Sequence, residues 1–151
     1  MNDLTVLGSE EWCVFEELGI PAIKARVDSG AKTSSIQATN SKIVMRGGHE
    51  WVQFEVHPLQ KDRSITIPCE APLIDKRTVR SSSGVSEERL VVKTPLKLGD
   101  NTFDIELTLT NRDNMDFRML LGREALSGRC VVDPGQMLLM GDFSQEDLDK
   151  A

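Results

Sequence analysis

Hydrophobic and polar residues alternate along most of this chain, and residues that favour turns interrupt the alternation repeatedly. Alternation with a period of two, enriched in β-branched residues, predicts strands that bury one face. The predicted strands are Thr5–Leu7, Trp12–Phe15, Ile23–Asp28, Lys42–Arg46, Trp51–His57, Arg63–Pro68, Arg89–Thr94, Thr102–Thr110, Arg118–Leu121, Val131–Asp133 and Met137–Met140. A chain of many short strands favours an all-β barrel or sandwich.

Turn-forming residues separate the predicted strands, at Leu18–Pro21, Gly47–Gly48, Gly99–Asn101 and Asp133–Gly135. One short helix is predicted after Gly122, running through Glu124–Leu126 and ending at Gly128, which suits the left-handed position after a helix. Residues 142–151 form a polar, acidic tail that we expect to be a frayed terminus or a marginal helical turn. Since no Gly/Ser/Pro-rich linker divides the chain, a single domain over residues 1–151 is predicted.

Composition narrows the class of protein. The 151 residues are 39% hydrophobic and 28% charged, which is typical of a globular protein with its own core. The net charge is −6 and the Lys and Arg residues are scattered, which disfavours nucleic acid and anionic membrane surfaces as partners. Cys13, Cys69 and Cys130 are odd in number and far apart, so free thiols are expected. No signal peptide or membrane span is evident, so we expect a cytoplasmic location, although a removed leader would leave no trace.

The strongest candidate for chemistry is Asp28, where an apolar strand runs into the sequence Asp-Ser-Gly-Ala. A tight turn at the end of a buried strand projects the Asp28 carboxylate into a cavity. Gly30 lets the backbone turn sharply and come close to a substrate or a second chain. Ala31 keeps the floor of the cavity small, and Ser29 offers a hydroxyl that can hydrogen-bond to an equivalent loop.

A second block, Met119–Leu126, places Gly122 94 positions after Asp28 (122 − 28). Its three leading apolar residues predict a buried strand beside the Asp28 loop. Gly122 permits a close backbone approach at the bend, and Arg123 could anchor loops by hydrogen bonds. Taken alone, two apolar residues followed by Gly-Arg are common and fit an ordinary strand–turn–helix.

Together the two blocks resemble the half-sites of retropepsin-like aspartic peptidases. Over roughly Val14 to Leu139 the chain also resembles a bacterial family labelled ATP-dependent zinc proteases, in the stretches Asp28–Ser35, Val79–Gly84, Glu88–Val92 and Leu121–Leu126. That family has a retropepsin-like fold, and some members are fused to, or encoded beside, an ATP-grasp glutamate ligase of the ribosomal-protein-modifying type. The resemblance implies a closed acid-protease barrel with Asp28 as the catalytic carboxylate. It further implies an active-site loop containing Ser29, Gly30, Ala31 and Thr33, supported by Leu121, Gly122 and Arg123.

A single carboxylate cannot carry out this chemistry. Two carboxylates at close range share one proton, because like charges cannot both ionise there. One then draws a proton from water while the other polarises the scissile carbonyl. Only one Asp-Thr/Ser-Gly-Ala copy is present, since Val132–Gly135 has Pro134 in place of the hydroxyl residue and is predicted to be a β-turn. The sequence therefore predicts a C2 homodimer in which Asp28 faces its symmetry mate.

The resemblance also implies a flap, a mobile hairpin over the cleft, with a tip formed by Arg80, Ser81, Ser82, Ser83 and Gly84. Flap closure would exclude water and position the substrate. From the residues alone, a Ser/Gly cluster predicts only a loop. Lys32 departs from the retroviral pattern, in which an Asp at this position pairs with the Arg of Gly-Arg. Lys32 cannot pair with Arg123, and either adds positive charge near Asp28 or is simply solvated.

Three functions remain open at this point. The first is a homodimeric aspartic endopeptidase acting on a peptide or protein, for which Arg77, Arg80 and Arg89 could meet an acidic substrate such as a polyglutamate tail. The second is a binding or regulatory barrel, acting on or with a glutamate ligase, in which Asp28 is a structural carboxylate. The third is a zinc hydrolase, which is disfavoured because His49 lacks a second His at HExxH spacing and His57 falls in a strand pattern. No cofactor or metal is expected, and no GxxxxGK[ST] loop indicates ATP binding.

Overall fold

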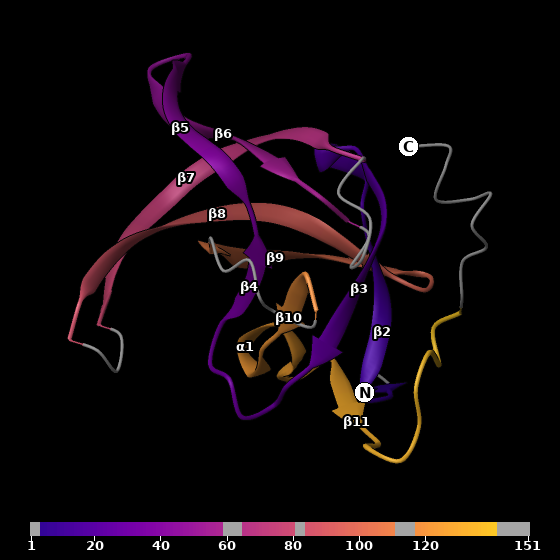
Figure 1. Ribbon diagram of the computed structural model, residues 1–151. Helices are drawn as coiled ribbons and strands as arrows, with labels where there is room; N and C mark the ends of the chain where they lie inside the picture. The colour runs from indigo at the N-terminus through magenta and orange to yellow at the C-terminus, as the bar shows by residue number, and fades with distance from the viewer. Residues whose placement is uncertain (1–3, 59–64, 81–83, 111–116, 142–151) are drawn as a thin grey trace.

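The computed structural model of the protein describes residues 4–58, 65–80, 84–110 and 117–141 (Figure 1). Strands make up most of it, and the fold is all-β, as predicted. The elements are β1 (Thr5–Leu7), β2 (Glu10–Phe15), the 3-10 helix η1 (Glu16–Leu18), β3 (Ile20–Val27), β4 (Ser34–Gln37), β5 (Thr39–Arg46), β6 (His49–Val56), β7 (Ile67–Arg80), β8 (Ser86–Leu98), β9 (Asn101–Thr110), β10 (Met119–Leu121), α1 (Arg123–Leu126) and β11 (Cys130–Val132). Within the described residues, no helix has the length and apolar character needed to cross a membrane.

Six strands close into a barrel in the order β2-β3-β10-β4-β9-β8, and a pairing of β2 with β8 completes the ring. Closure depends on Val14, which pairs with Lys97 of β8. A closed barrel leaves no free strand edge around its circumference. This arrangement confirms the closed barrel implied by the sequence.

The remaining strands of the large sheet extend beyond the barrel from β8, in the order β8-β7-β6-β5. β5 and β6 form one long hairpin, and β7 forms another with the barrel strand β8; the two hairpins project from the barrel in different directions (Figure 1). Arg46 on β5 donates two hydrogen bonds to the Glu70 carboxylate on β7, with N–O distances of 2.5 and 3.0 Å. These bonds lower the pKa of Glu70 below its usual range.

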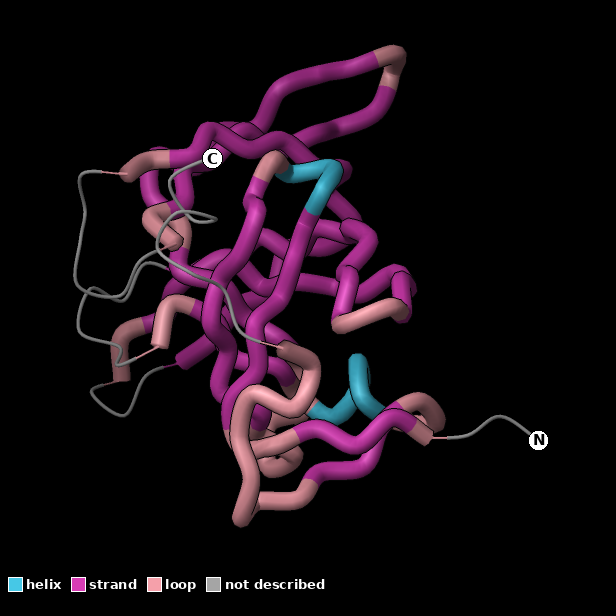
Figure 2. The backbone as a smooth tube through the Cα atoms, turned by 90° about the vertical axis from the view of Figure 1, so that its right-hand side faces the viewer, coloured by secondary structure: helices cyan, strands magenta, loops and turns pink. Residues whose placement is uncertain are grey.

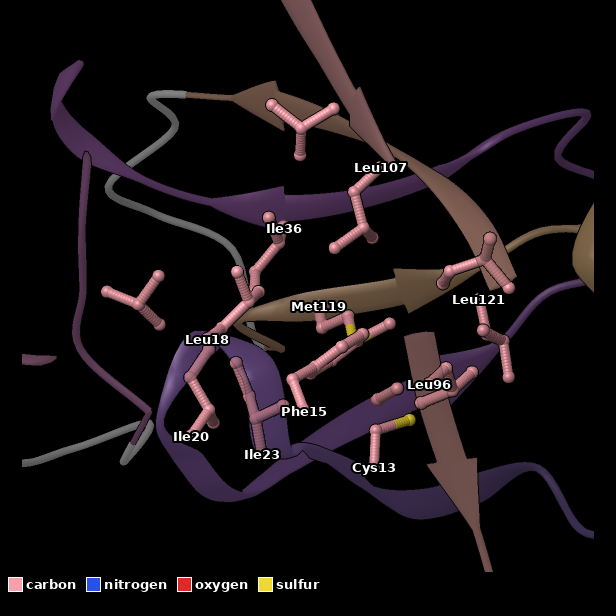
Figure 3. Packing of buried hydrophobic residues seen from close by; sticks show 14 of the residues in the cluster. Cys13, Phe15, Leu18, Ile20, Ile23, Ile36, Leu96, Leu107, Met119 and Leu121 are labelled. Atoms are coloured by element: carbon pink, nitrogen blue, oxygen red, sulfur yellow. The ribbon is translucent and has the colours of Figure 1, made fainter. Parts of the chain in front are cut away.

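The core lies inside the barrel and under the long hairpins. Figure 3 shows Phe15, Met119, Leu121, Leu96 and Ile23 packed against one another, and all of them are fully buried. These side chains come from strands spread across the whole sequence, so burial of their apolar surface joins β2, β3, β8 and β10 into one unit. Buried residues alternate along β2, and β3 is also mostly buried, so both strands turn apolar side chains into the barrel.

The two ends of the described chain meet at one pole of the molecule. β1 and β11 pair in parallel, with Thr5 opposite Cys130 and Leu7 opposite Val132. In Figure 2 this small sheet and α1 lie at the pole opposite the β5–β6 hairpin. The loop between β3 and β4, which carries Asp28, lies at the same lower end as β11 in Figure 1.

The structure corrects several predicted elements. Met137–Met140 is not a strand, because the backbone N–H groups of Leu139 and Met140 bond to the Glu11 carboxylate and Leu138 has a φ of 55°. β4 was not predicted, since its sequence Ser-Ser-Ile-Gln has little apolar signal. The strand predicted at Arg63–Pro68 begins only at Ile67 and continues to Arg80, while residues 59–64 lie outside the described residues.

Other predicted elements are confirmed. The short helix α1 follows Gly122, and Gly128 adopts the left-handed conformation with a φ of 78°. The turns at Gly47–Gly48 and Gly99 are present, with positive φ at each glycine. The turn predicted at Leu18–Pro21 is present at Gly19, which is left-handed with a φ of 75° between η1 and β3. The predicted polar tail, residues 142–151, lies outside the described residues.

Candidate active site

The insertion of β10 between β3 and β4 builds the site. β10 runs parallel to β3, with Leu121 opposite Val27, and antiparallel to β4, with Met119 opposite Ile36. Asp28 and Gly122 therefore leave neighbouring strands side by side. The buried strand predicted beside the Asp28 loop is confirmed, although its pairing with β4 could not be anticipated because β4 itself was missed.

Hydrogen bonds hold the Asp28 loop in a tight turn. The Asp28 carboxylate accepts a bond from the Gly30 N–H through Oδ1 at 3.0 Å. The Ala31 N–H donates to the Asp28 carbonyl at 3.1 Å, and the Asp28 N–H donates to the Leu121 carbonyl at 2.9 Å. A carboxylate that bonds to the N–H two residues later forms an Asx turn. The Asp28 side chain is half-buried, so the turn fixes its direction without sealing it from solvent.

Gly122 is the closest point of contact between the two blocks. A Cβ atom there would lie 2.5 Å from the Thr33 carbonyl oxygen and 3.0 Å from that of Ala31. The Gly122 N–H donates to the Ser34 hydroxyl at 3.0 Å. The φ of Gly122 is −92°, which any residue can adopt. Glycine is therefore required here because a side chain has no room, and not because of the backbone conformation. The Ser34 hydroxyl therefore joins the two blocks.

Arg123 anchors the loop from the other side. Its guanidinium donates through Nη1 to the Gly30 carbonyl at 3.1 Å, and its backbone N–H donates to the Ala31 carbonyl at 2.8 Å. This is the loop anchoring that the sequence suggested for Arg123. Lys32 lies 3.8 Å from Glu124, one residue beyond Arg123, and both side chains are well exposed. Lys32 therefore forms a solvent-screened ion pair with Glu124, where the retroviral pattern has an Asp that pairs with the Arg of Gly-Arg.

The structure brings most of the predicted site residues together. Ser29, Gly30 and Arg123 are exposed, Ala31 and Thr33 are half-buried, and Leu121 and Gly122 are buried beneath the loop. A cavity of about 340 Å³ borders this cluster, with Thr33, Ser34 and Ala125 among the residues that line it. The loop is held against the start of α1, where the N–H groups of Arg123 and Glu124 donate to the carbonyls of Ala31 and Lys32.

The candidate flap is the hairpin of β7 and β8. Arg80 ends β7, where its backbone pairs with Ser86, and Gly84 has a φ of 83° just before β8. Ser81, Ser82 and Ser83 lie outside the described residues. The implied hairpin is thus present at the expected position, and its role over a cleft remains a prediction.

Two arginines of this hairpin already contact acidic side chains. Arg77 bonds to Asp75 at 2.9 Å and to Glu106 at 3.2 Å, and these bonds raise the pKa of Arg77. Arg89 lies 4.0 Å from Glu87. An acidic substrate would have to compete with these exposed partners, which are weakly bound in water.

Sequence reasoning missed one buried carboxylate. Glu11 is fully buried and accepts hydrogen bonds from the N–H groups of Gly8 at 2.7 Å, Leu139 at 3.0 Å and Met140 at 2.9 Å. Backbone N–H groups that converge on a buried carboxylate satisfy its charge. The signal in the sequence was the period of two, since Glu11 shares the inward face of β2 with Cys13 and Phe15.

The described residues do not provide a zinc site. No three His, Cys, Asp or Glu side chains among them are grouped so that they could hold a metal ion. His57 instead contacts the hydroxyls of Thr39 and Thr66, at 3.5 and 3.2 Å. The three cysteines are free thiols, as expected.

A closed barrel with one Asp-Ser-Gly-Ala loop locked against a Gly-Arg segment defines a retropepsin-like half-site. Residues 6–141 match the family described as "RimB-like: Retropepsin-like aspartic endopeptidase RimB". The chain therefore belongs to the RimB-like family of retropepsin-like aspartic endopeptidases.

Similar proteins add an association with ligases. The chain is 60% identical to a probable alpha-L-glutamate ligase of Desulfotalea psychrophila over 97% of its own length, and 53% identical to one of Shewanella pealeana over 96%. It spans only 32% of either relative. A crystal structure of a Legionella pneumophila protein of unknown function is similar, with a TM-score of 0.77 and 25% identity, covering 91% of this chain and 99% of that one.

Proposed function

We propose that the protein is an aspartic endopeptidase whose catalytic dyad is assembled from two copies of Asp28. The observation that carries this proposal is the fixed Asp28 turn. The Gly30 N–H orients its carboxylate, and the Arg123 guanidinium donates a hydrogen bond to the Gly30 carbonyl in the same turn. Membership of a retropepsin-like endopeptidase family supports the same chemistry.

In this mechanism, the two Asp28 carboxyl groups hold one proton between them. The ionised carboxylate takes a proton from a water molecule, whose oxygen attacks the carbonyl carbon of the peptide bond. The protonated carboxyl group donates its hydrogen to the carbonyl oxygen as charge develops there. The tetrahedral intermediate then expels the amine, which receives a proton from the dyad, and the products are a carboxylic acid and an amine.

The substrate we infer is a peptide or protein segment, with acidic residues near the cleaved bond. Lys32 and Arg123 are exposed beside the Asp28 loop, and Arg77 lies on the candidate flap. Cationic side chains around a cleft attract anionic substrates. Relatives named as glutamate ligases also fit a polyglutamate product as the substrate.

The first test is Asp28→Asn. Asn has nearly the same shape, so it preserves the turn with Gly30, but it cannot share a proton as a carboxylate does. We expect an unchanged circular dichroism spectrum and a loss of peptide cleavage of at least about 10³-fold, in the range found when a catalytic group is removed. Cleavage that survives in a folded Asp28→Asn protein would rule out the mechanism.

A mixing experiment tests the dyad directly. If wild-type and Asp28→Asn subunits exchange freely, an equal mixture contains about one quarter of fully wild-type dimers by random pairing of a C2 dimer. The activity per wild-type subunit should therefore fall by about half, since heterodimers lack one carboxylate. An activity that stays proportional to the amount of wild-type protein would mean that each subunit works alone.

The relatives favour a second candidate, a non-catalytic barrel that binds or regulates a glutamate ligase. The chain matches about a third of the length of relatives named as probable alpha-L-glutamate ligases. In those relatives the sequence of the barrel is therefore part of a longer protein named as a ligase. In this case Asp28 would serve only to hold its turn through the Gly30 N–H. An unbiased peptide library that is cleaved by the wild type but not by Asp28→Asn would exclude this alternative.

A further inference from the structure

Two open cavities adjoin on the face of the molecule where β8 changes its partner strand. The pairing of β8 with β7 ends at Val92, and its pairing with β2 is at Lys97. The first cavity has a volume of about 680 Å³ and the second of about 670 Å³, and Glu17 and Glu70 line both. The two cavities therefore form one groove with Glu17 and Glu70 at its centre, which we call the outer groove.

The outer groove lies far from the Asp28 loop. η1, which carries Glu17, comes directly before β3, and Asp28 comes directly after it. A strand of the length of β3, at about 3.3 Å per residue, spans about 25 Å. In Figure 2 η1 lies near the β5–β6 hairpin, at the pole opposite α1. A molecule bound in the groove therefore leaves the Asp28 loop accessible.

The charge in the outer groove is predominantly negative. Five acidic and two basic residues line it, a net charge of −3 (2 − 5): Glu16, Glu17, Glu55, Glu70 and Asp104 against Lys42 and Lys93. Arg46 pairs with Glu70, and Lys97 pairs with Glu16. Glu17 and Asp104 are exposed, and within the described residues neither forms an ion pair. The groove therefore attracts a cationic ligand, and Glu17 is well placed to meet it because it lines both cavities.

Part of the groove is apolar. Trp51, Pro72 and Pro95 line the second cavity, and Ile74 lines it with 43% of its surface exposed. Trp51 lies opposite Pro72 in the pairing of β6 with β7. An aromatic ring and an exposed aliphatic side chain in one cavity offer apolar surface to a ligand. The cationic ligand is therefore expected to carry an apolar side chain as well.

A buried hydroxyl group in the second cavity lacks a hydrogen-bond partner. Thr94 lines this cavity and is 2% exposed, and its Oγ1 forms no hydrogen bond among the described residues. Buried polar groups are nearly always paired, so this atom points to a ligand that supplies the missing bond. The backbone N–H and C=O groups of an extended peptide can supply it, at the place where β8 passes from β7 to β2.

We propose that the outer groove is an exosite that binds an extended, basic segment of the protein substrate, remote from the bond that is cleaved. A Lys or Arg side chain of that segment meets Glu17, and a neighbouring apolar side chain packs on Trp51 and Ile74. Binding there keeps the rest of the substrate at a high effective concentration beside the Asp28 loop. The assignment of the segment to the substrate rests on the proposed function, whereas the binding of a basic peptide does not depend on cleavage.

The first test measures binding to the Asp28→Asn protein, so that the ligand stays intact. The probe is a short fluorescein-labelled peptide rich in Lys and Leu, and its counterpart has Glu in place of each Lys. We expect fluorescence anisotropy to show that the Lys peptide binds at least about 10-fold more tightly than the Glu peptide. Adding Glu17→Lys should raise the dissociation constant of the Lys peptide at least about 10-fold, and adding Ile74→Ser should raise it about 3-fold or more.

Asp100→Lys is the matched control, with thermal unfolding to show that each variant folds. Asp100 is exposed in the turn between β8 and β9, and its replacement changes the net charge by the same amount as Glu17→Lys. At physiological salt a charge more than about 8 Å from the ligand is largely screened, so the dissociation constant should change less than about 2-fold. Equal weakening by Asp100→Lys and Glu17→Lys, or equal binding of the two peptides, would overturn the exosite.

The second test asks whether the bound segment belongs to the substrate. A peptide that the wild type cleaves is joined to the Lys/Leu segment through a Gly/Ser linker of about 20 residues, whose r.m.s. length of about 25 Å matches the span of β3. We expect KM to fall at least about 10-fold with kcat unchanged, and this gain to vanish in Glu17→Lys. A linker of about four residues reaches at most about 14 Å and should give no gain. A long linker that also gives no gain would overturn the assignment to the substrate.

The exosite and the proposed function can fail separately. If Glu17→Lys loses the Lys peptide but Asp28→Asn still cleaves peptides, the groove stands and the dyad mechanism fails. If Asp28→Asn is inactive but Glu17→Lys binds the Lys peptide as the wild type does, the mechanism stands and the exosite fails. A wild type that binds the Lys peptide but cleaves no peptide would overturn the assignment to the substrate together with the proposed function.

Discussion

At the scale of single residues, the site depends on the absence of a side chain at Gly122 as much as on the polar groups around it. Gly122 carries no side chain because the carbonyl of Thr33 occupies the space where a Cβ would lie. The same close approach lets Ser34 accept the Gly122 N–H and lets Arg123 reach Gly30. The sequence could identify Gly122 and Arg123 by their order, but the partner Ser34 depends on a strand it did not reveal.

Gly122→Ala tests this close contact. The added methyl group must push the Thr33 backbone away, and overpacking of this kind costs about 1–3 kcal/mol. We expect a lower midpoint of urea unfolding together with a loss of cleavage that exceeds the loss of folded protein, since the Asp28 turn shifts with Thr33. Gly128→Ala, with no atom near its Cβ, is the control for a glycine substitution, although its positive φ adds a small cost of its own. Unchanged stability and cleavage in Gly122→Ala would show that the Thr33 backbone can move to make room for a methyl group without disturbing the Asp28 turn.

The cysteines offer a second test at this scale. Burial raises the pKa of the Cys69 thiol to about 12 and raises the pKa of the Cys13 thiol as well, where the Glu11 charge adds to the effect. A thiol reacts as its thiolate, so both should be unreactive in the folded protein at pH 8. We expect an Ellman assay of native protein to detect at most Cys130, and all three thiols only after unfolding. Rapid modification of a Cys13→Ser, Cys130→Ser protein would show that Cys69 is accessible.

At the scale of elements, one strand from late in the sequence organises two from early in it. β10 separates β3 from β4 and pairs with both, so it fixes the exit of Asp28 and the return of the chain at Ser34. Alternation identified β3 and β10, because each buries an apolar face. β4 escaped detection because only Ile36 gives an apolar signal, and Ser34 and Gln37 are buried through their position between two strands.

Glu11 joins segments from the two ends of the described chain, and Glu11→Gln should loosen them. The amide nitrogen of Gln cannot accept a hydrogen bond, so at least one N–H among Gly8, Leu139 and Met140 loses its partner. We expect a loss of about 1–3 kcal/mol in the free energy of unfolding, measured in urea. Glu10→Gln is the matched control: Glu10 is partly exposed, lies 3.9 Å from Lys24, and should cost under about 1 kcal/mol. Equal effects in the two variants would contradict the buried role of Glu11.

At the scale of the whole molecule, the fold class and the two motif blocks followed from the sequence. Period-two alternation and turn residues specify an all-β chain, and the blocks carry the resemblance that implied a closed barrel. Pairings between distant strands did not follow, because alternation does not encode register between segments such as β1 and β11. The segment after β11 shows the limit most clearly: Met137–Met140 has a strand-like pattern, yet its N–H groups bond to a carboxylate from β2.

The late position of β10 in the sequence affects when the site can form during synthesis on the ribosome. During synthesis, Asp28 leaves the ribosome 94 residues before Gly122 (122 − 28), which corresponds to about 5–20 seconds of translation. Until β10 and the residues after it are made, the Asp28 turn lacks its hydrogen bonds to Leu121 and Arg123, and the ring of strands stays open. Under the proposed function, a nascent chain that ends before β10 would therefore have no completed Asp28 site, and cleavage could begin only after this last barrel strand is made.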